Sequence, residues 1–316
     1  MSQTLSPATA ELAGRRTAER TRVKRGIRWG RVAAWAVMGL IVFVSLFPFW
    51  WMLRTALSTN ADLVTGNQSL LPVHPTLLNI KQVLGLASAK ELADAGTQTS
   101  ADVNFFVALR NSIVVATLIT AGQLTFCAMA AYAFARLRFP GRDKLFFLFL
   151  TAMMIPPIFT LIPNFVLIKN LGWLNSFAGI VAPFFLMTPF AVFFLRQFFL
   201  GISREVEEAA LLDGAGRWKI FRQLIIPMSV APLVTLAVLT YITAWHEYMW
   251  PLVTGDSEHV RVLTVALNAF KSSTPTAAPP WGPLMAATFL AAVPLIVLFL
   301  TMAKRMVDAI GFSGIK

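Results

Sequence analysis

Long apolar runs separated by shorter polar segments dominate the sequence. A helix needs about 20 residues to cross roughly 30 Å of hydrocarbon, and several runs reach that length. The pattern therefore predicts an all-α, polytopic membrane protein with about six transmembrane helices. The expected spans are approximately Val32–Leu53, Asn111–Phe134, Leu145–Ile168, Phe177–Phe199, Met228–Val253 and Pro283–Ala303.

The composition supports a bilayer rather than a large soluble core. Hydrophobic residues make up 57% of the chain and charged residues 13%, against about 45–50% and about 25% in soluble domains. The first apolar run could be a secretion signal, but its apolar core is longer than the usual 7–15 or so residues. We therefore expect a retained first span. The single cysteine, Cys127, lies in an apolar run and offers neither a disulfide framework nor a metal cluster.

The distribution of Lys and Arg predicts the orientation, because cytoplasmic loops carry an excess of both. With the N-terminus in the cytoplasm, most of the 27 basic residues fall on that side. They precede the first span, follow the second, lie between the fourth and fifth, and close the chain. Topology then explains the net charge of +12, and we expect a multi-pass cell-membrane protein with both termini in the cytoplasm and no nucleic-acid partner.

The same arrangement predicts three regions. Residues 1–31 form a basic, disordered, cytoplasmic N-terminus, residues 32–303 form the transmembrane domain, and residues 304–316 form a cytoplasmic tail. The long outer loop near residues 54–110 is expected to hold short helices.

Proline is frequent inside the expected spans, above all in the third and fourth. Each proline removes a backbone hydrogen bond, and in lipid such breaks persist only where protein or a wet cavity satisfies the freed carbonyls. Broken helices of this kind often line transport paths, although proline is also simply commoner in membrane helices. The prolines concerned are Pro156, Pro157, Pro163, Pro183 and Pro189, with Pro232 and Pro294 in the last two spans.

The cytoplasmic segment at residues 200–227 has a pattern of its own. Gly214 and Gly216 are expected to end a short helix, because both tolerate left-handed backbone angles. Pro227 is expected to begin the next span, where a missing N–H is harmless. The helix would present a small-residue face suited to a groove on a partner, or it would pack as an ordinary loop against its own bundle. That face consists of Val206, Ala209, Ala210 and Leu212.

The order of residues in this segment resembles the EAA loop of ABC-importer permeases. The matching positions are Glu208, Ala209, Ala210 and Gly214, followed by Leu224, Ile226 and Pro227. Residues 131–141 and 195–199 and the pair Asn111-Ser112 are similar to segments of carbohydrate-type importers. The group that the chain most resembles is the smaller permease subunit of maltose-transporter-like systems.

The resemblance implies a transport subunit rather than an enzyme, with no cofactor of its own. It would form half of a carbohydrate pathway, as a heterodimer with a second permease subunit. A cytosolic ATPase dimer would use ATP and grip the EAA loop, and an extracytoplasmic binding protein would deliver the solute. Glu208 would make polar contacts, Ala209 and Ala210 would allow close approach, Gly214 would permit the turn, and Asp213 would cap or pair locally.

Polar and aromatic residues near the end of the expected fifth span are candidates for the outer mouth of the pathway. Hydrogen-bonding and aromatic groups together suit sugars, but a position near the outer boundary favours an interfacial belt of Trp245, Tyr248 and Trp250. His246 also stands where the related permeases usually have Asn, and the C-terminal residues 310–316 differ from their Gly-rich tail. The candidates are Trp245, His246, Glu247 and Tyr248, with Asn164 in the third span.

Two other classes of protein remain as alternatives. An ATP-independent secondary carrier or channel is disfavoured by the EAA-type loop and by the lack of paired membrane-buried acids. A membrane-embedded enzyme or a metal site is disfavoured because His74, His246 and His259 are scattered. The sequence also lacks a phosphate-cradling Gly-rich loop with Lys-Ser/Thr, so ATP must bind elsewhere.

Overall fold

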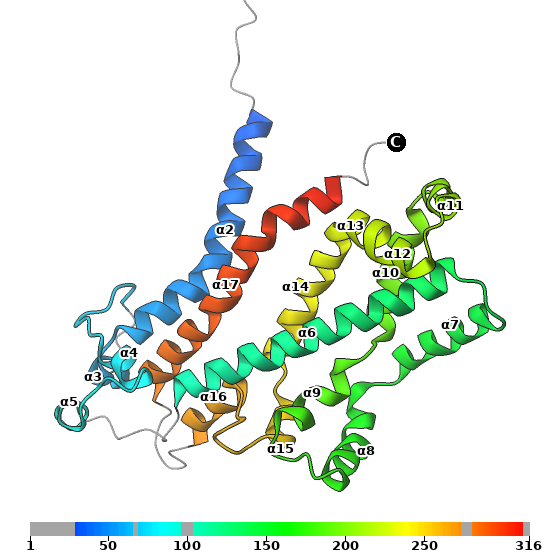
Figure 1. The fold of residues 1–316 in the computed structure, drawn as a ribbon. Helices are drawn as coiled ribbons and strands as arrows, with labels where there is room; N and C mark the ends of the chain where they lie inside the picture. Colours follow the sequence, from blue (N-terminus) through cyan, green and yellow to red (C-terminus); the bar gives the residue numbers. More distant parts are fainter. Residues whose placement is uncertain (1–28, 66–68, 96–103, 273–279, 312–316) are drawn as a thin grey trace, which may run out of the picture. The chain divides into compact units, whose positions relative to one another are not determined.

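Helices form all the regular structure that the computed structural model describes, in residues 29–65, 69–95, 104–272 and 280–311 (Figure 1). This confirms the all-α prediction. The disorder expected for the N-terminus lies almost wholly outside the described residues. The chain divides into one unit that ends at Trp50 and a second that begins at Trp51. Helix α2 (Trp29–Ala56) crosses this boundary, and the second unit contains all the other helices.

Three single helices are long and apolar enough to span a membrane, over Gly30–Ala56, Phe105–Arg136 and Trp281–Ala303. They belong to α2, α6 (Phe105–Arg136) and α17 (Trp281–Gly311) and match the first, second and sixth predicted spans. Helix α17 continues to Gly311, past the boundary that the sequence placed at residue 304.

The other three predicted spans are bent pairs of helices. The third comprises Arg142–Met154 and Pro157–Asn170, bent by 98°; the fourth comprises Phe177–Phe185 and Pro189–Gly201, bent by 45°; the fifth comprises Arg217–Met228 and Val230–His246, bent by 78°. Counting each pair as one span gives up to six, in agreement with the sequence. In these spans the helical elements are α7 (Arg142–Thr151), a 3₁₀ turn (Ala152–Met154), α8 (Pro157–Asn170), α9 (Phe177–Phe185), α10 (Pro189–Gly201), α12 (Arg217–Ile220), a π-helical turn (Phe221–Ile225), α13 (Ile226–Met228) and α14 (Val230–His246).

Proline explains two of the bends. Pro157 and Pro189 each stand at the first turn of the second helix of a pair, where the missing N–H costs nothing. The residue before a proline is pushed out of the helical region, and Pro156 and Thr188 accordingly have extended ψ angles of 134° and 141°. Pro183, by contrast, is accommodated inside α9.

The predicted fifth span begins within two residues of α14 but is wrong at its C-terminal end. Pro227 lies in the first turn of α13, and the sharp bend follows at Ser229, so that α14 begins at Val230. Helix α14 stops at His246 instead of continuing to Val253, because Glu247 is extended (ψ 126°). A separate helix, α15 (Met249–Thr254), then begins.

Helix α6 is the centre of the second unit, because it packs against α9, α10, α14 and α16 (Leu263–Ser272). The closest approaches use small residues, as is usual between membrane helices. The residues of α6 that face its neighbours are fully buried, among them Ala116, Cys127 and Ala131. The short helices expected between the first two spans are also present. They are α3 (Asn60–Val64), α4 (Leu78–Val83) and α5 (Ala89–Asp94).

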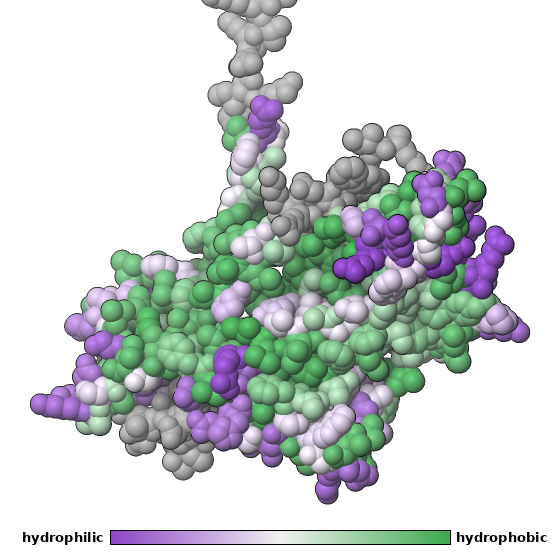
Figure 2. Space-filling model, in the orientation of Figure 1, coloured by the Kyte–Doolittle hydropathy of each residue, from purple (hydrophilic) through white to green (hydrophobic). Residues whose placement is uncertain are grey.

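Apolar side chains cover much of the face seen in Figure 2, whereas hydrophilic ones gather around α11 (Arg204–Leu212) and α12. Exposed apolar residues are frequent on α8, where Ile158, Phe159 and Ile162 each expose more than half of their surface. A soluble monomer rarely leaves apolar surface of such extent uncovered, so this distribution fits a lipid-facing protein.

Candidate functional site

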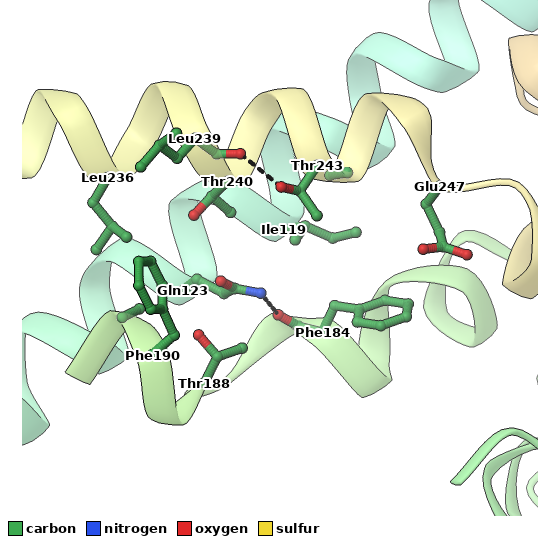
Figure 3. Close-up of a pocket in the computed structure, with 12 residues that line it drawn as sticks. Ile119, Gln123, Phe184, Thr188, Phe190, Leu236, Leu239, Thr240, Thr243 and Glu247 are labelled. Carbon is green, nitrogen blue, oxygen red and sulfur yellow. Dashed lines mark hydrogen bonds between the residues drawn. The ribbon is translucent and has the colours of Figure 1, made fainter. Parts of the chain in front are cut away.

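A pocket lies between the interrupted fourth span and the C-terminal half of α14, against the middle of α6 (Figure 3). Its volume is about 230 Å³, and its walls are mainly apolar. A few polar groups converge on it from all three spans: Gln123 of α6, Thr188 at the start of α10, Thr240 and Thr243 of α14, and Glu247 beyond the end of α14. Complete small-molecule pockets measure about 300–1,000 Å³, so this pocket is somewhat smaller than a complete small-molecule site.

Gln123 supports the break in the fourth span. The last carbonyls of a helix have no intrahelical partner, and in a membrane the protein itself must satisfy them. The Gln123 side-chain amide donates to the carbonyl oxygen of Phe184, near the end of α9, at 2.8 Å. The preceding residue, Gly122, allows α6 to approach Phe185 so closely that a Cβ atom there would overlap its carbonyl oxygen. The break is therefore held in place while the carbonyl oxygen of the Gln123 amide remains available to the pocket.

Glu247 supports the junction between the end of α14 and the start of α15. Its carboxylate accepts a hydrogen bond from the backbone N–H of Trp250 at 3.2 Å, which caps the start of α15. Its backbone carbonyl accepts a bond from the Thr264 hydroxyl at 2.8 Å. The carboxylate is thus fixed at one end of the pocket (Figure 3).

The arrangement suits a solute that has both hydroxyl groups and apolar faces. Carboxylate and amide oxygens accept hydrogen bonds, and threonine hydroxyls can donate or accept. Thr243 already donates to the Leu239 carbonyl at 2.9 Å, so it offers the pocket an acceptor. Phe184 and Phe190 supply aromatic wall.

Of the predicted outer-mouth residues, only Glu247 lines this pocket. Trp245 is buried and stacks on Tyr241 with ring centroids 6.0 Å apart. His246 is exposed, with Nδ1 2.8 Å from the Ile242 carbonyl one turn earlier. Tyr248 is half-buried beside an apolar cluster, and Asn164 is half-buried on α8.

The alternative of an interfacial aromatic belt is wrong for Trp245 and Trp250, because both are buried. The Trp250 indole N–H points into the protein and lies 3.1 Å from the Gly179 carbonyl and 3.2 Å from the Ile180 carbonyl. Trp250 therefore connects α15 to α9, the first helix of the interrupted fourth span.

The second candidate region is the helix–turn–helix of α11 and α12. Gly214 has a left-handed φ of 78°, as the sequence predicted. The N–H of Gly214 bonds to the Leu211 carbonyl at 3.0 Å, and the N–H of Ala215 bonds to the Ala210 carbonyl at 2.9 Å. This pair of bonds is a Schellman motif, which satisfies the last carbonyls of α11. Gly216 does not share the left-handed role expected of it, since its φ is −68° and it is the N-cap of α12.

The predicted coupling residues divide between two faces of α11. Glu208, Ala209 and Leu212 are exposed, and Leu212 shows 89% of its surface. Ala210 instead packs against the cluster of buried residues between α6 and α10. Asp213 is exposed at the C-cap of α11, and the described residues give it no ion pair.

Several polar residues of these regions were not singled out from the sequence. Gln123 and Thr240 line the pocket, and Arg136 forms a buried ion pair with Glu207 at 2.9 Å. For Gln123 the sequence did contain a signal, because a glutamine stands out inside an otherwise apolar run. The EAA pattern singled out Glu208, but no sequence signal showed that its neighbour Glu207 is buried, because helix phase decides which of the two faces inward.

Apolar spans, a pocket with polar groups between them and an exposed helix–turn–helix are the features expected of a membrane permease. A family model described as "Binding-protein-dependent transport system inner membrane component" matches residues 123–311. The chain therefore belongs to this family, and the resemblance to ABC-importer permeases is confirmed. The protein is a multi-pass inner-membrane component and the permease subunit of an ABC importer.

Named relatives agree with this assignment. The chain is 30% identical over 275 residues to the sn-glycerol-3-phosphate transport system permease protein UgpE of Salmonella typhi, covering 86% of this chain and 92% of that protein. It is 28% identical over 278 residues to the trehalose/maltose transport system permease protein MalG of Thermococcus litoralis, covering 88% and 94%. The crystal structure of a bacterial ABC transporter involved in alginate import has the same fold, with a TM-score of 0.71 and 24% identity over 89% of this chain and 98% of that chain.

Proposed function

We propose that this chain forms one half of the pathway of a carbohydrate importer and that the pocket between α6, α9–α10 and α14 contacts the solute. The observation that supports this most is the placement of polar groups at the break of the fourth span and at the end of α14. Gln123 holds the break of the fourth span, Glu247 holds the junction of α14 and α15, and both residues line the pocket. Interrupted spans that meet at a polar site are typical of transport pathways.

A carbohydrate is proposed because the pocket offers neutral hydrogen-bonding groups, aromatic wall and one carboxylate. A solute with a phosphate would be repelled by Glu247, and the other polar residues that line the pocket carry no positive charge to compensate. The names of the relatives include trehalose and maltose as well as sn-glycerol-3-phosphate, so the choice between neutral and anionic solutes rests on this electrostatic argument.

Transport would be coupled to ATP through α11. The exposed residues Glu208, Ala209 and Leu212 would dock in a cleft of a cytosolic ATPase, with Gly214 fixing the turn. The partners would be a dimer of that ATPase, which uses ATP, a second permease subunit that completes the pathway, and an extracytoplasmic binding protein. This chain would bind no cofactor. Both termini would lie in the cytoplasm, on the same side as α11.

The solute proposal is tested by uptake in proteoliposomes that hold the complete transporter. The probes are maltose, trehalose and sn-glycerol-3-phosphate. We expect Glu247→Gln and Thr240→Val each to lower uptake of a disaccharide by about tenfold, which is the effect of losing one hydrogen bond to a charged or buried group. Thr235→Val on the same helix, where the hydroxyl bonds to its own turn, and Glu258→Gln in an exposed turn are the matched controls. Unchanged uptake in both pocket variants would rule the pocket out as a contact site.

A further inference from the structure

One guanidinium group joins three helices at the end of the molecule that carries α11. Arg136 stands in the last turn of α6, and its Nε atom lies 2.9 Å from Oε1 of Glu207 on α11. The Arg136 side chain is 3% exposed and that of Glu207 7%. The same guanidinium donates to the carbonyl oxygens of Phe199 and Ile202, at the C-terminal end of α10.

Each of these contacts places the positive guanidinium beside a group that carries negative charge. A buried carboxylate is strongly unfavourable without a positive partner, and Arg136 provides one for Glu207. The carbonyls at the end of α10 carry partial negative charge, and the guanidinium bonds to two of them: that of Phe199, which also accepts the Ile202 N–H, and that of Ile202. Removing Arg136 would therefore free α11 and the end of α10 together.

The helices that Arg136 joins continue to the pocket. Gln123 precedes Arg136 on α6 by about 20 Å at 1.5 Å per residue. The first turn of α10 contributes Phe190 and Ala191 to the pocket, and α10 packs against α6. A displacement of α11 that reaches Arg136 would thus reach both of these pocket walls.

We propose that Arg136 and Glu207 are positioning residues that transmit movement of α11 to α6 and α10, and so to the pocket. The inference rests on the proposed docking of α11 to an ATPase. Glu207 and Glu208, adjacent in the chain, have separate tasks. Glu208 faces outward for docking, whereas Glu207 holds the docked helix to the transmembrane bundle.

The alternative is that the pair only stabilises the fold, and a double variant separates the two roles. A buried ion pair can often be replaced by apolar residues of similar volume without loss of stability. Arg136→Met combined with Glu207→Met should therefore fold and assemble, but it lacks the directed bonds to Phe199 and Ile202. The single variants Arg136→Ala and Glu207→Ala show the effect of removing each partner alone. The control is Arg138→Ala, because Arg138 is an exposed arginine two residues further along the chain.

The readout is movement at the pocket, which needs no identified solute. Thr240→Cys reports it through its rate of reaction with a maleimide in the complete transporter with its ATPases and binding protein, before and after ATP with vanadate. The native Cys127 is fully buried. We expect the Arg136→Met/Glu207→Met variant to retain ATPase activity and thermal stability. Its ATP-dependent change in labelling rate should be at least about tenfold smaller than that of the parent, since about 1.4 kcal/mol of lost coupling is a factor of ten. Arg138→Ala should respond like the parent.

A full ATP response in the double variant would overturn the proposal and leave the pair a stabilising role alone. Loss of the ATPase from that variant would also overturn it, because docking would then depend on the pair. If the parent itself showed no ATP-dependent change, the proposed coupling through α11 would be at fault rather than the ion pair.

Discussion

Gly122 lies directly against Phe185, where the fourth span is interrupted. A Cβ atom at Gly122 would overlap both the carbonyl oxygen and the ring of Phe185. The glycine therefore sets how closely α6 can support the broken span, and the neighbouring Gln123 bonds to the Phe184 carbonyl at 2.8 Å only because of that approach. The pocket beside them depends on this contact.

The contact between Gly122 and Phe185 can be tested by adding a methyl group to the glycine. Gly122→Ala should destabilise the protein by about 1–3 kcal/mol, because the added methyl group must displace backbone, and it should also reduce uptake. Thermal unfolding of the purified protein in detergent measures the loss. Gly201→Ala, at a site where a Cβ would meet no heavy atom within 4 Å, should leave the transition unchanged. Equal unfolding temperatures for the two variants would contradict the close packing of α6 on the break.

The turn after α11 can be tested with two glycines that lie two residues apart. Gly214 has φ 78° and Gly216 has φ −68°, although neither would place a Cβ near another atom. Alanine in the left-handed region costs about 1–2 kcal/mol, so Gly214→Ala should weaken the turn and lower ATPase stimulation, whereas Gly216→Ala should not. Similar stimulation in both variants would show that the geometry of the turn is unimportant for coupling.

If α11 docks through Leu212, a charged residue at this position should prevent binding of the ATPase. Leu212 is 89% exposed, and Leu212→Asp should place a charge in the proposed cleft and prevent the ATPase from co-purifying with the permease. Leu86 is a matched exposed leucine, at 69%, which follows α4. Leu86→Asp should leave the complex intact. A complex that survives Leu212→Asp would exclude this residue from the docking surface.

The same two positions test the orientation. In intact cells, a membrane-impermeant maleimide should label Leu86→Cys and spare Leu212→Cys, and in inverted vesicles the pattern should be reversed. The chain has one native cysteine, which is buried and gives little background. Labelling of Leu212→Cys from outside the cell would invert the expected topology.

Much of the fold follows from local chemistry that the sequence displays. Apolar runs predict the spans, the cluster of prolines in the third and fourth spans indicates breaks there, which the structure places at Pro157 and Pro189, and the sequence around Gly214 predicts a left-handed turn. The end of α14 could not be predicted in this way, because Glu247 interrupts an otherwise apolar stretch by capping Trp250. The prediction extended the helix to Val253 because hydropathy contains no signal for that cap.

The candidate site was less predictable than the fold. Glu247 was expected near a mouth, but its association with Gln123 depends on packing between residues more than 100 positions apart in the chain. Trp245 is aromatic and close to a span end, which suggested the pathway, yet α14 is rotated so that the ring stacks on Tyr241. The buried position of Glu207 follows from the phase of α11 against Arg136, which only the folded chain defines.

The most direct test of the account compares binding-protein-stimulated ATP hydrolysis with uptake in the same proteoliposomes. These hold this chain, the second permease subunit, the ATPase dimer and the binding protein. The account predicts that Glu208→Lys, on the exposed face of α11, abolishes both activities, whereas Glu258→Lys, in an exposed turn away from α11, retains them. Normal stimulation and uptake in Glu208→Lys would contradict the claim that this permease is driven through α11.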